Sequence, residues 1–296
     1  MEKKKEFLKL KSNDGGLAFA LLMCLYVFAV FIGQSIAGAI APAGSVTFYA
    51  ICAIFPALVI SVIIVYYCVY KKFNPLEVTG IKKFNPCWLL FSLVLFVGAF
   101  FGLGFINGLF QTFLESFGLK FDNDIVIYGV GELVVYIIFI AIVPAVFEEM
   151  FFRGLLLNAF NGSKKVVAIL LSSMCFALYH ASAVQLFYQF LMGVGLALLA
   201  LNAKSIIPCI VTHFLNNFVI LLLTYFNVKI NLYNALLIVG GVALLVVFVL
   251  FTVRNLVKNK TQSVEERPVV SFFLPFGVLG VAVCLLLVAI SLIPVA

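Results

Sequence analysis

At the centre of the apolar run 126–160, the chain reads Pro144-Ala-Val-Phe-Glu-Glu-Met-Phe-Phe-Arg153. The run is longer than the ~20 residues with which a helix crosses the hydrocarbon core of a bilayer. Three of its central residues, Glu148, Glu149 and Arg153, are nonetheless ionisable. Each such residue at the centre of a membrane helix costs roughly 2.5–3.5 kcal/mol on insertion scales, so a cluster of three predicts a functional site.

The whole chain has the composition of a protein that crosses the membrane several times. Of its 296 residues, 65% are hydrophobic and 10% charged, and the mean hydropathy is +1.23, unlike a soluble domain. The apolar runs predict eight or nine transmembrane helices in an all-α fold around a polar intramembrane cavity. These runs lie at about 17–40, 46–70, 87–110, 126–160, 166–182, 184–203, 205–226, 232–253 and 269–294. The polar stretches between them are too short for a soluble domain, so we expect one membrane domain over residues 1–296 with a catalytic core at about 126–226.

Basic residues indicate the orientation, because Lys and Arg accumulate on the cytoplasmic side of membrane proteins. With nine spans, 16 of the 19 Lys and Arg fall in one set of alternating segments, and only Lys120 and Lys229 fall in the other. We therefore expect a multi-pass protein of a bacterial cell membrane, with its N-terminus in the cytoplasm. The net charge of +7 then reflects topology and contact with anionic membrane lipids, and no nucleic-acid partner is expected.

The spacing of the charged residues suggests different tasks for the two glutamates. Residues i and i+4 share a helix face, so Glu149 and Arg153 are predicted to form a structural ion pair. Glu148 then points about 100° away and is left to face a cavity. Pro144 has no backbone N–H and leaves a carbonyl oxygen free one turn before the acidic pair, so a local irregularity of the helix is expected there.

The two histidines of the chain also lie in apolar runs. His180 ends the string Phe176-Ala-Leu-Tyr-His180, in which Phe176 and the imidazole share a helix face. His213 and Asn217, again four residues apart, present an imidazole and a carboxamide together. Each pattern alone is weak, since a single histidine in an apolar helix is more often structural than catalytic. A Glu, two His and an Asn at similar depths on three separate helices are better explained by one shared site.

Taken in order, Glu-Glu-x-x-x-Arg, Phe-x-x-x-His and His-x-x-x-Asn resemble the motifs of the CPBP intramembrane proteases. These include the type II CAAX-processing endopeptidases and the bacteriocin-processing and immunity proteins. The resemblance covers about residues 126–226. It implies an intramembrane endopeptidase in which Glu148 is the general base that activates water, assisted by His180. It also implies that His213 and Asn217 stabilise the oxyanion of the tetrahedral intermediate.

The residues themselves suit peptide hydrolysis, which needs a base for water and donors aimed at the developing oxyanion. A metal site is the alternative, because Glu148, His180 and His213 also form the ligand set of a catalytic zinc. No His-Glu-x-x-His helix is present, and Asn217 is a poor zinc ligand but a good oxyanion donor. We therefore expect no cofactor, with zinc as the alternative.

Three classes of function are consistent with these residues. The first is an endopeptidase that acts on a membrane-associated or lipidated peptide or protein. The second is a non-proteolytic scaffold, or a bacteriocin-immunity or regulatory protein, that uses the same cavity to bind a membrane-protein partner. The third is a proton-coupled carrier, because carriers also place Glu and His inside the membrane. We expect the endopeptidase.

Overall fold

The computed structural model describes residues 8–119, 125–228, 230, 234–258 and 267–292. Apart from an isolated bridge between Leu8 and Phe73, the regular structure of these residues is helical. The chain is therefore an all-α, multi-pass membrane protein, as its composition predicts.

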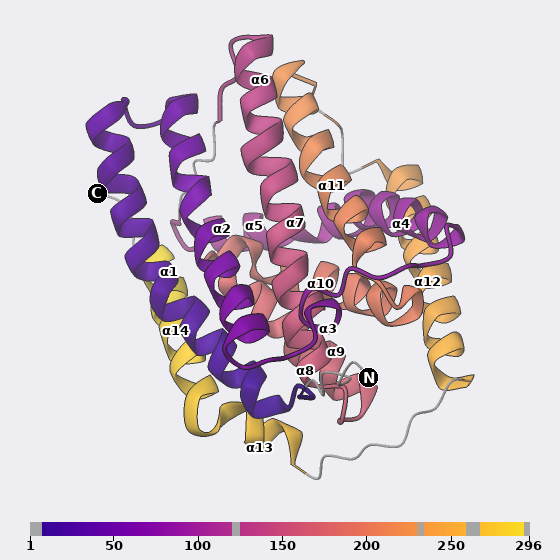
Figure 1. Ribbon diagram of the computed structural model, residues 1–296. Coiled ribbons are helices and arrows are strands. Elements are labelled where there is room, and N and C mark those ends of the chain that lie inside the picture. Colours follow the sequence, from indigo (N-terminus) through magenta and orange to yellow (C-terminus); the bar gives the residue numbers. More distant parts are fainter. Residues whose placement is uncertain (1–7, 120–124, 229, 231–233, 259–266, 293–296) are drawn as a thin grey trace.

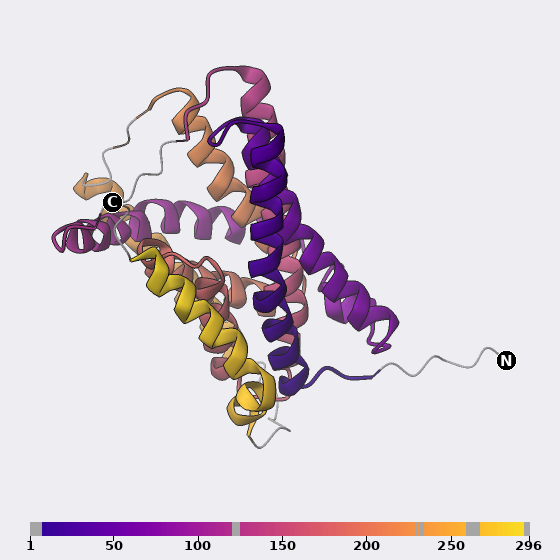
Figure 2. The same cartoon turned by 90° about the vertical axis from the view of Figure 1, so that its left-hand side faces the viewer.

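Long helices form the body of the protein (Figures 1 and 2). The first half contains α1 (Ser12–Ile40), α2 (Val46–Val69), α3 (Pro75–Thr79), α4 (Cys87–Gly98), η1 (Ala99–Leu103) and α5 (Gly104–Glu115), where η marks a π-helical segment. The middle contains α6 (Val130–Tyr136), η2 (Ile137–Ile142), α7 (Val143–Glu149), η3 (Met150–Leu156), α8 (Leu157–Ala159), α9 (Lys165–Tyr179), α10 (Ala183–Ala203) and α11 (Ile207–Tyr225). The last part contains α12 (Ala235–Lys258), α13 (Pro268–Phe272), η4 (Phe273–Gly277) and α14 (Val278–Ser291).

Within the described residues, eight helical segments are long and apolar enough to cross a membrane. They match eight of the nine predicted runs, with boundaries that differ by a few residues. The ninth run differs because α9 has only 15 residues, or about 22 Å of helix against a hydrocarbon core of ~30 Å. The helix begins at the basic pair Lys164 and Lys165, so its C-terminal neighbour His180 lies at membrane depth.

The charged run forms one continuous helix over residues 130–159, in which the π-helical segments η2 and η3 flank α7. The irregularity expected at Pro144 is present. The Ile140 carbonyl oxygen, which a regular helix would pair with the N–H of residue 144, accepts a hydrogen bond from Asn217 Nδ2 on α11 at 3.1 Å. Inserted π-helical turns are frequent at functional sites. Here both glutamates lie on α7, between the π-helical segments η2 and η3.

The packing places α7 among helices from distant parts of the chain. α1 packs against α2, α9 packs against α10, and α7 contacts both α2 and α11. In Figures 1 and 2 the segment of α4, η1 and α5 lies nearly horizontal, whereas α1 and the helix that contains α7 are steeper. The charged centre of the chain is therefore enclosed by helices that precede and follow it.

Basic residues gather at one end of the molecule. Figure 1 shows α3, the α8–α9 junction and the C-terminal end of α12 at its lower end, and these elements adjoin most of the basic connecting segments. The six remaining lysines of the topology argument lie outside the described residues: Lys3, Lys4, Lys5, Lys120, Lys229 and Lys260. The cytoplasmic N-terminus stays a prediction.

Candidate active site

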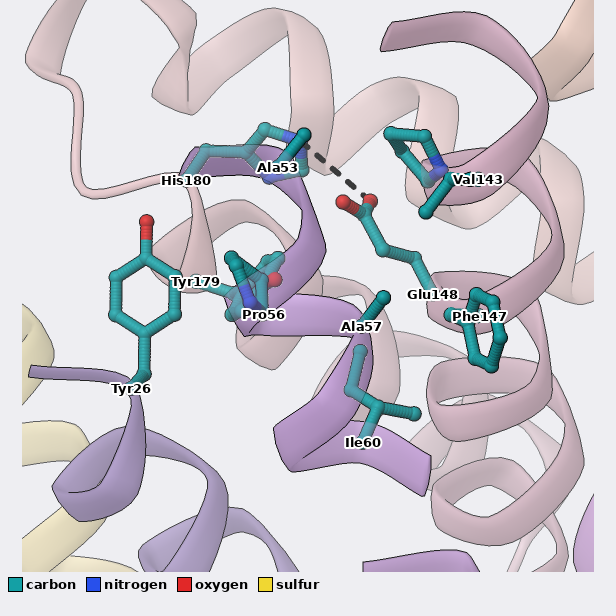
Figure 3. Close-up of a pocket in the computed structure, with 11 residues that line it drawn as sticks. Tyr26, Ala53, Pro56, Ala57, Ile60, Val143, Phe147, Glu148, Tyr179 and His180 are labelled. Atoms are coloured by element: carbon teal, nitrogen blue, oxygen red, sulfur yellow. Dashed lines mark ion pairs between the residues drawn. The ribbon is translucent and has the colours of Figure 1, made fainter. Parts of the chain in front are cut away.

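Glu148 on α7 and His180 after α9 line one cavity of about 190 Å³ (Figure 3). Its walls come from α1, α2, α7 and α9. Glu148 Oε2 lies 3.9 Å from His180 Nε2, which is too far for a direct hydrogen bond. The same oxygen is buried and accepts no hydrogen bond from the described residues. The cavity thus contains a carboxylate acceptor without a donor.

The orientation of the His180 ring follows from one hydrogen bond. His180 Nδ1 lies 2.8 Å from the carbonyl oxygen of Phe176. A carbonyl oxygen only accepts, so we infer that Nδ1 carries the proton. In the neutral ring, Nε2 is then an acceptor, and this atom faces Glu148.

Glu149 belongs to a second, fully buried cluster. Its Oε1 accepts hydrogen bonds from Arg153 Nη1 at 3.2 Å and from His213 Nδ1 at 3.0 Å. The side chains of Arg153 and Glu149 are 1% and 0% exposed. The structure thus contains the ion pair expected from the i, i+4 spacing and extends it to His213. The carboxylate holds the His213 ring through Nδ1, so that Nε2 is the nitrogen left for other partners.

Phe176 joins the two clusters. Its ring lies under the Arg153 guanidinium, with 4.1 Å between the Arg153 Cζ atom and the ring centroid. It also makes edge-on contacts with both histidines, at centroid distances of 4.7 Å to His180 and 6.0 Å to His213. The aromatic residue of the Phe-x-x-x-His motif is therefore a buried spacer that fixes the relative positions of the charged groups.

Asn217 stands at the end of a chain of polar side chains. Tyr188 donates to Asn216 Oδ1 at 2.7 Å, and Asn216 Nδ2 donates to Asn217 Oδ1 at 3.2 Å. Asn217 Nδ2 in turn donates to the Ile140 carbonyl oxygen. A carboxamide nitrogen has two hydrogens, so one N–H of Asn217 remains. The network fixes the direction of this donor.

The structure places two of the four predicted catalytic residues in the wall of this cavity. Glu148 and His180 line the cavity, whereas His213 and Asn217 are not among its lining residues. Sequence reasoning did not single out Tyr26 and Tyr179, which line the cavity, and Figure 3 shows Tyr26 across the cavity from Glu148. A tyrosine within an apolar span is a signal in the sequence that a polar site is near. Only the folded chain shows that these two tyrosines lie on the same cavity as Glu148.

The zinc alternative requires Glu148, His180 and His213 to converge. In the part of the chain that the structure describes, no group of three or more His, Cys, Asp or Glu side chains is arranged to hold a metal ion. His213 contacts the carboxylate of Glu149 through Nδ1, and its remaining nitrogen, Nε2, does not form such a group with Glu148 and His180. The donor set in this arrangement does not fit a three-ligand zinc centre.

Residues 130–219 match the family model described as "Type II CAAX prenyl endopeptidase Rce1-like". The matched range contains every residue of the two clusters: Glu148, Glu149, Arg153, Phe176, His180, His213 and Asn217. Over this range the chain is similar to that family, in agreement with the resemblance carried by the three motifs. Comparison of the chain with curated proteins and with solved structures gave no match.

Proposed function

We propose that this protein is an intramembrane endopeptidase of the CAAX-processing type, in which Glu148 activates water to cleave a membrane-associated or lipidated peptide. The observation that carries the proposal is the pair of acceptors in one cavity, Glu148 Oε2 and His180 Nε2, 3.9 Å apart. The family match supports peptide hydrolysis as the reaction class.

A water molecule suits this pair because it donates two hydrogen bonds. With one hydrogen on each acceptor, its lone pairs are directed toward a substrate carbonyl carbon. As the water oxygen forms a bond to that carbon, Glu148 takes the proton, and the carbonyl π electrons move onto oxygen. When the C–N bond breaks, Glu148 returns the proton to the leaving amine nitrogen.

His213 and Asn217 are proposed as donors to the resulting oxyanion. Both lie on α11, which packs against α7 and η2. The second N–H of Asn217 is held in a fixed direction by its neighbours. His213 Nδ1 lies 3.0 Å from Glu149 Oε1, so we propose that Nε2 is the ring nitrogen that faces the oxyanion. One such preorganised donor is worth roughly 2.7–4 kcal/mol.

The test is a cleavage assay with purified protein in detergent micelles. Its substrates are a prenylated C-terminal peptide and a set of unmodified membrane peptides, with the products identified by mass spectrometry. Wild-type protein is expected to cut a specific bond, and Glu148→Gln, which keeps the shape but not the base, is expected to lose activity by more than ~10³-fold.

Glu132→Gln is the matched control. Glu132 lies in the same apolar run, where its carboxylate accepts from the Tyr128 backbone N–H at 2.8 Å, and it does not line the cavity. The control is expected to cleave at the wild-type rate. Near-wild-type cleavage by Glu148→Gln would sink the catalytic assignment and leave the binding or scaffold function as the explanation of the cavity.

A further inference from the structure

A second cavity, of about 380 Å³, lies at the basic end of the molecule. It is bounded by the α8–α9 junction, the turn between α10 and α11, the loop that follows α3, and the end of α12. It shares no lining residue with the cavity that Glu148 and His180 line. Arg153 lines it, but the Arg153 guanidinium is bound to Glu149.

Three lysines from separate parts of the chain converge on this cavity: Lys82, Lys165 and Lys204. No Asp or Glu is among the described residues that line it. Ammonium groups that share a cavity repel one another, and a bound anion reduces that repulsion.

Hydrogen bonds hold the lysine-bearing segments together. The Ile206 N–H donates to the Gly80 carbonyl oxygen at 3.1 Å, and the Lys82 N–H donates to Ser205 Oγ at 3.4 Å. Ser205 Oγ also accepts from the Ile207 N–H at 3.3 Å. Ser205 is buried and lines the cavity, and its hydroxyl still has its own hydrogen to donate.

Lys165 is positioned by a contact across the same cavity. Its Nζ donates to the Leu256 carbonyl oxygen at 3.3 Å, and Leu256 is itself a lining residue. This bond keeps a positive charge at the wall formed by α9 and α12.

We propose that this cavity binds a phosphate group, with Lys82, Lys165 and Lys204 as its cationic ligands and Ser205 as a neutral donor. Phosphate supplies several acceptor oxygens to such donors. Basic pockets between transmembrane helices at a membrane surface bind the headgroups of anionic lipids, whereas a soluble phosphate compound would present the same group.

Lys204→Gly is the most informative variant. Lys204 has φ 56°, in the left-handed region, where glycine is favoured, so the substitution removes the charge without opposing the backbone. Lys72→Gly is the matched control, because exposed Lys72 has φ 55° and does not line the cavity. Lys82→Gln is a second variant at an independent position.

The experiment measures lipid binding to the delipidated full chain by native mass spectrometry, together with thermal stability. The probes are dioleoylphosphatidylglycerol, zwitterionic dioleoylphosphatidylcholine and inorganic phosphate. Phosphatidylglycerol is expected to bind and stabilise the wild type and Lys72→Gly. Its affinity should fall about fivefold for Lys204→Gly and about 25-fold when Lys82→Gln is added, from the contribution of each basic residue to anionic-lipid binding.

The probes also identify the source of the phosphate. Binding of phosphatidylglycerol alone supports a lipid headgroup, and equal stabilisation by inorganic phosphate supports a soluble compound at the same site. An equal loss of phosphatidylglycerol affinity in Lys72→Gly and Lys204→Gly overturns the proposal, since the attraction would then come from general surface charge. Unchanged affinity in the double variant overturns it as well. Binding is measured without cleavage, so failure of the proposed protease function leaves this test intact.

Discussion

At the scale of single residues, the two adjacent glutamates have different surroundings. Each has one buried oxygen, Oε2, without a hydrogen-bond donor among the described residues. Glu148 lines a cavity, whereas Glu149 holds Arg153 and His213 through its other oxygen in a buried cluster. The surroundings of Glu148 suit a catalytic base, and those of Glu149 suit a residue that positions neighbouring side chains. Substitutions of the two residues should therefore differ in their effects on folding.

Loss of either partner in the Glu149–Arg153 pair should destabilise the protein. Removing one member of a buried pair leaves an uncompensated charge, which typically costs about 3–5 kcal/mol. We expect Glu149→Gln and Arg153→Met each to lower membrane abundance and the thermal midpoint in detergent. The double variant should be less destabilised than the sum of the two, and strictly additive effects would show that the pair does not stabilise the fold.

Chelation should leave cleavage unchanged, because the proposed mechanism uses no Lewis acid. The protein would be treated with a strong chelator, assayed, and then assayed again after addition of zinc. In the same assay, Asn217→Ala should reduce the rate by about 10²–10³, as expected for loss of an oxyanion donor. Chelator-sensitive cleavage that zinc restores would replace this mechanism with a metal-dependent one and leave the protease assignment in place.

At the scale of elements, the sequence predicts the helices well and their irregularities less well. Eight runs become candidate spans because bilayer thickness fixes how long an apolar helix must be. Pro144 reveals the irregularity near the acidic pair because the missing N–H is visible in the sequence. The π-helical segments η2 and η3 depend on tertiary contacts, such as the Asn217 bond to Ile140, which periodicity does not encode.

The contacts of the candidate site also divide into those that the sequence predicts and those that it does not. The pairing of Glu149 with Arg153 follows from helical geometry along one element, so its i, i+4 spacing is sufficient to expect it. The contact of His213 with Glu149 joins α11 to α7, and the exposure of Tyr26 to the cavity depends on how α1 packs. Contacts between elements of this kind require the folded chain.

Gly154 provides a prediction at this scale, because it lies where η3 crosses α3. A Cβ atom at Gly154 would lie 2.6 Å from the carbonyl oxygens of both Val78 and Thr79. These are backbone atoms, so the helix itself has to move. Gly154→Ala is expected to destabilise the protein by about 1–3 kcal/mol and lower its thermal midpoint.

Gly131→Ala is the control for that substitution. Gly131 lies in the same helical run, and nothing lies within 4 Å of the Cβ position there. Alanine is favoured over glycine inside a helix, so this variant should be as stable as the wild type or more stable. A similar loss of stability in both variants would contradict the assignment of Gly154 to a close crossing.

At the scale of the whole molecule, the cavity at Glu148 depends on helices outside the range that matches the family. Tyr26 of α1 and Ala53, Pro56, Ala57 and Ile60 of α2 line it, whereas the match covers residues 130–219. The N-terminal helices therefore form one wall of the site rather than a separate anchor. They are well placed to determine which peptides reach Glu148.

Filling the α2 wall should block the substrate and leave the catalytic groups in place. Ala57 has a small side chain in the cavity wall, while its neighbour Leu58 is 52% exposed on the outer surface of the molecule. We expect Ala57→Phe to lower kcat/KM at least tenfold by occupying the cavity, and Leu58→Phe to leave it unchanged.

Ala53→Phe, at another lining position one turn earlier, is an independent replicate. Membrane abundance and thermal midpoints should stay close to wild type in all three variants. If Ala57→Phe and Ala53→Phe are both folded and fully active, the substrate reaches Glu148 by a route that does not use this wall.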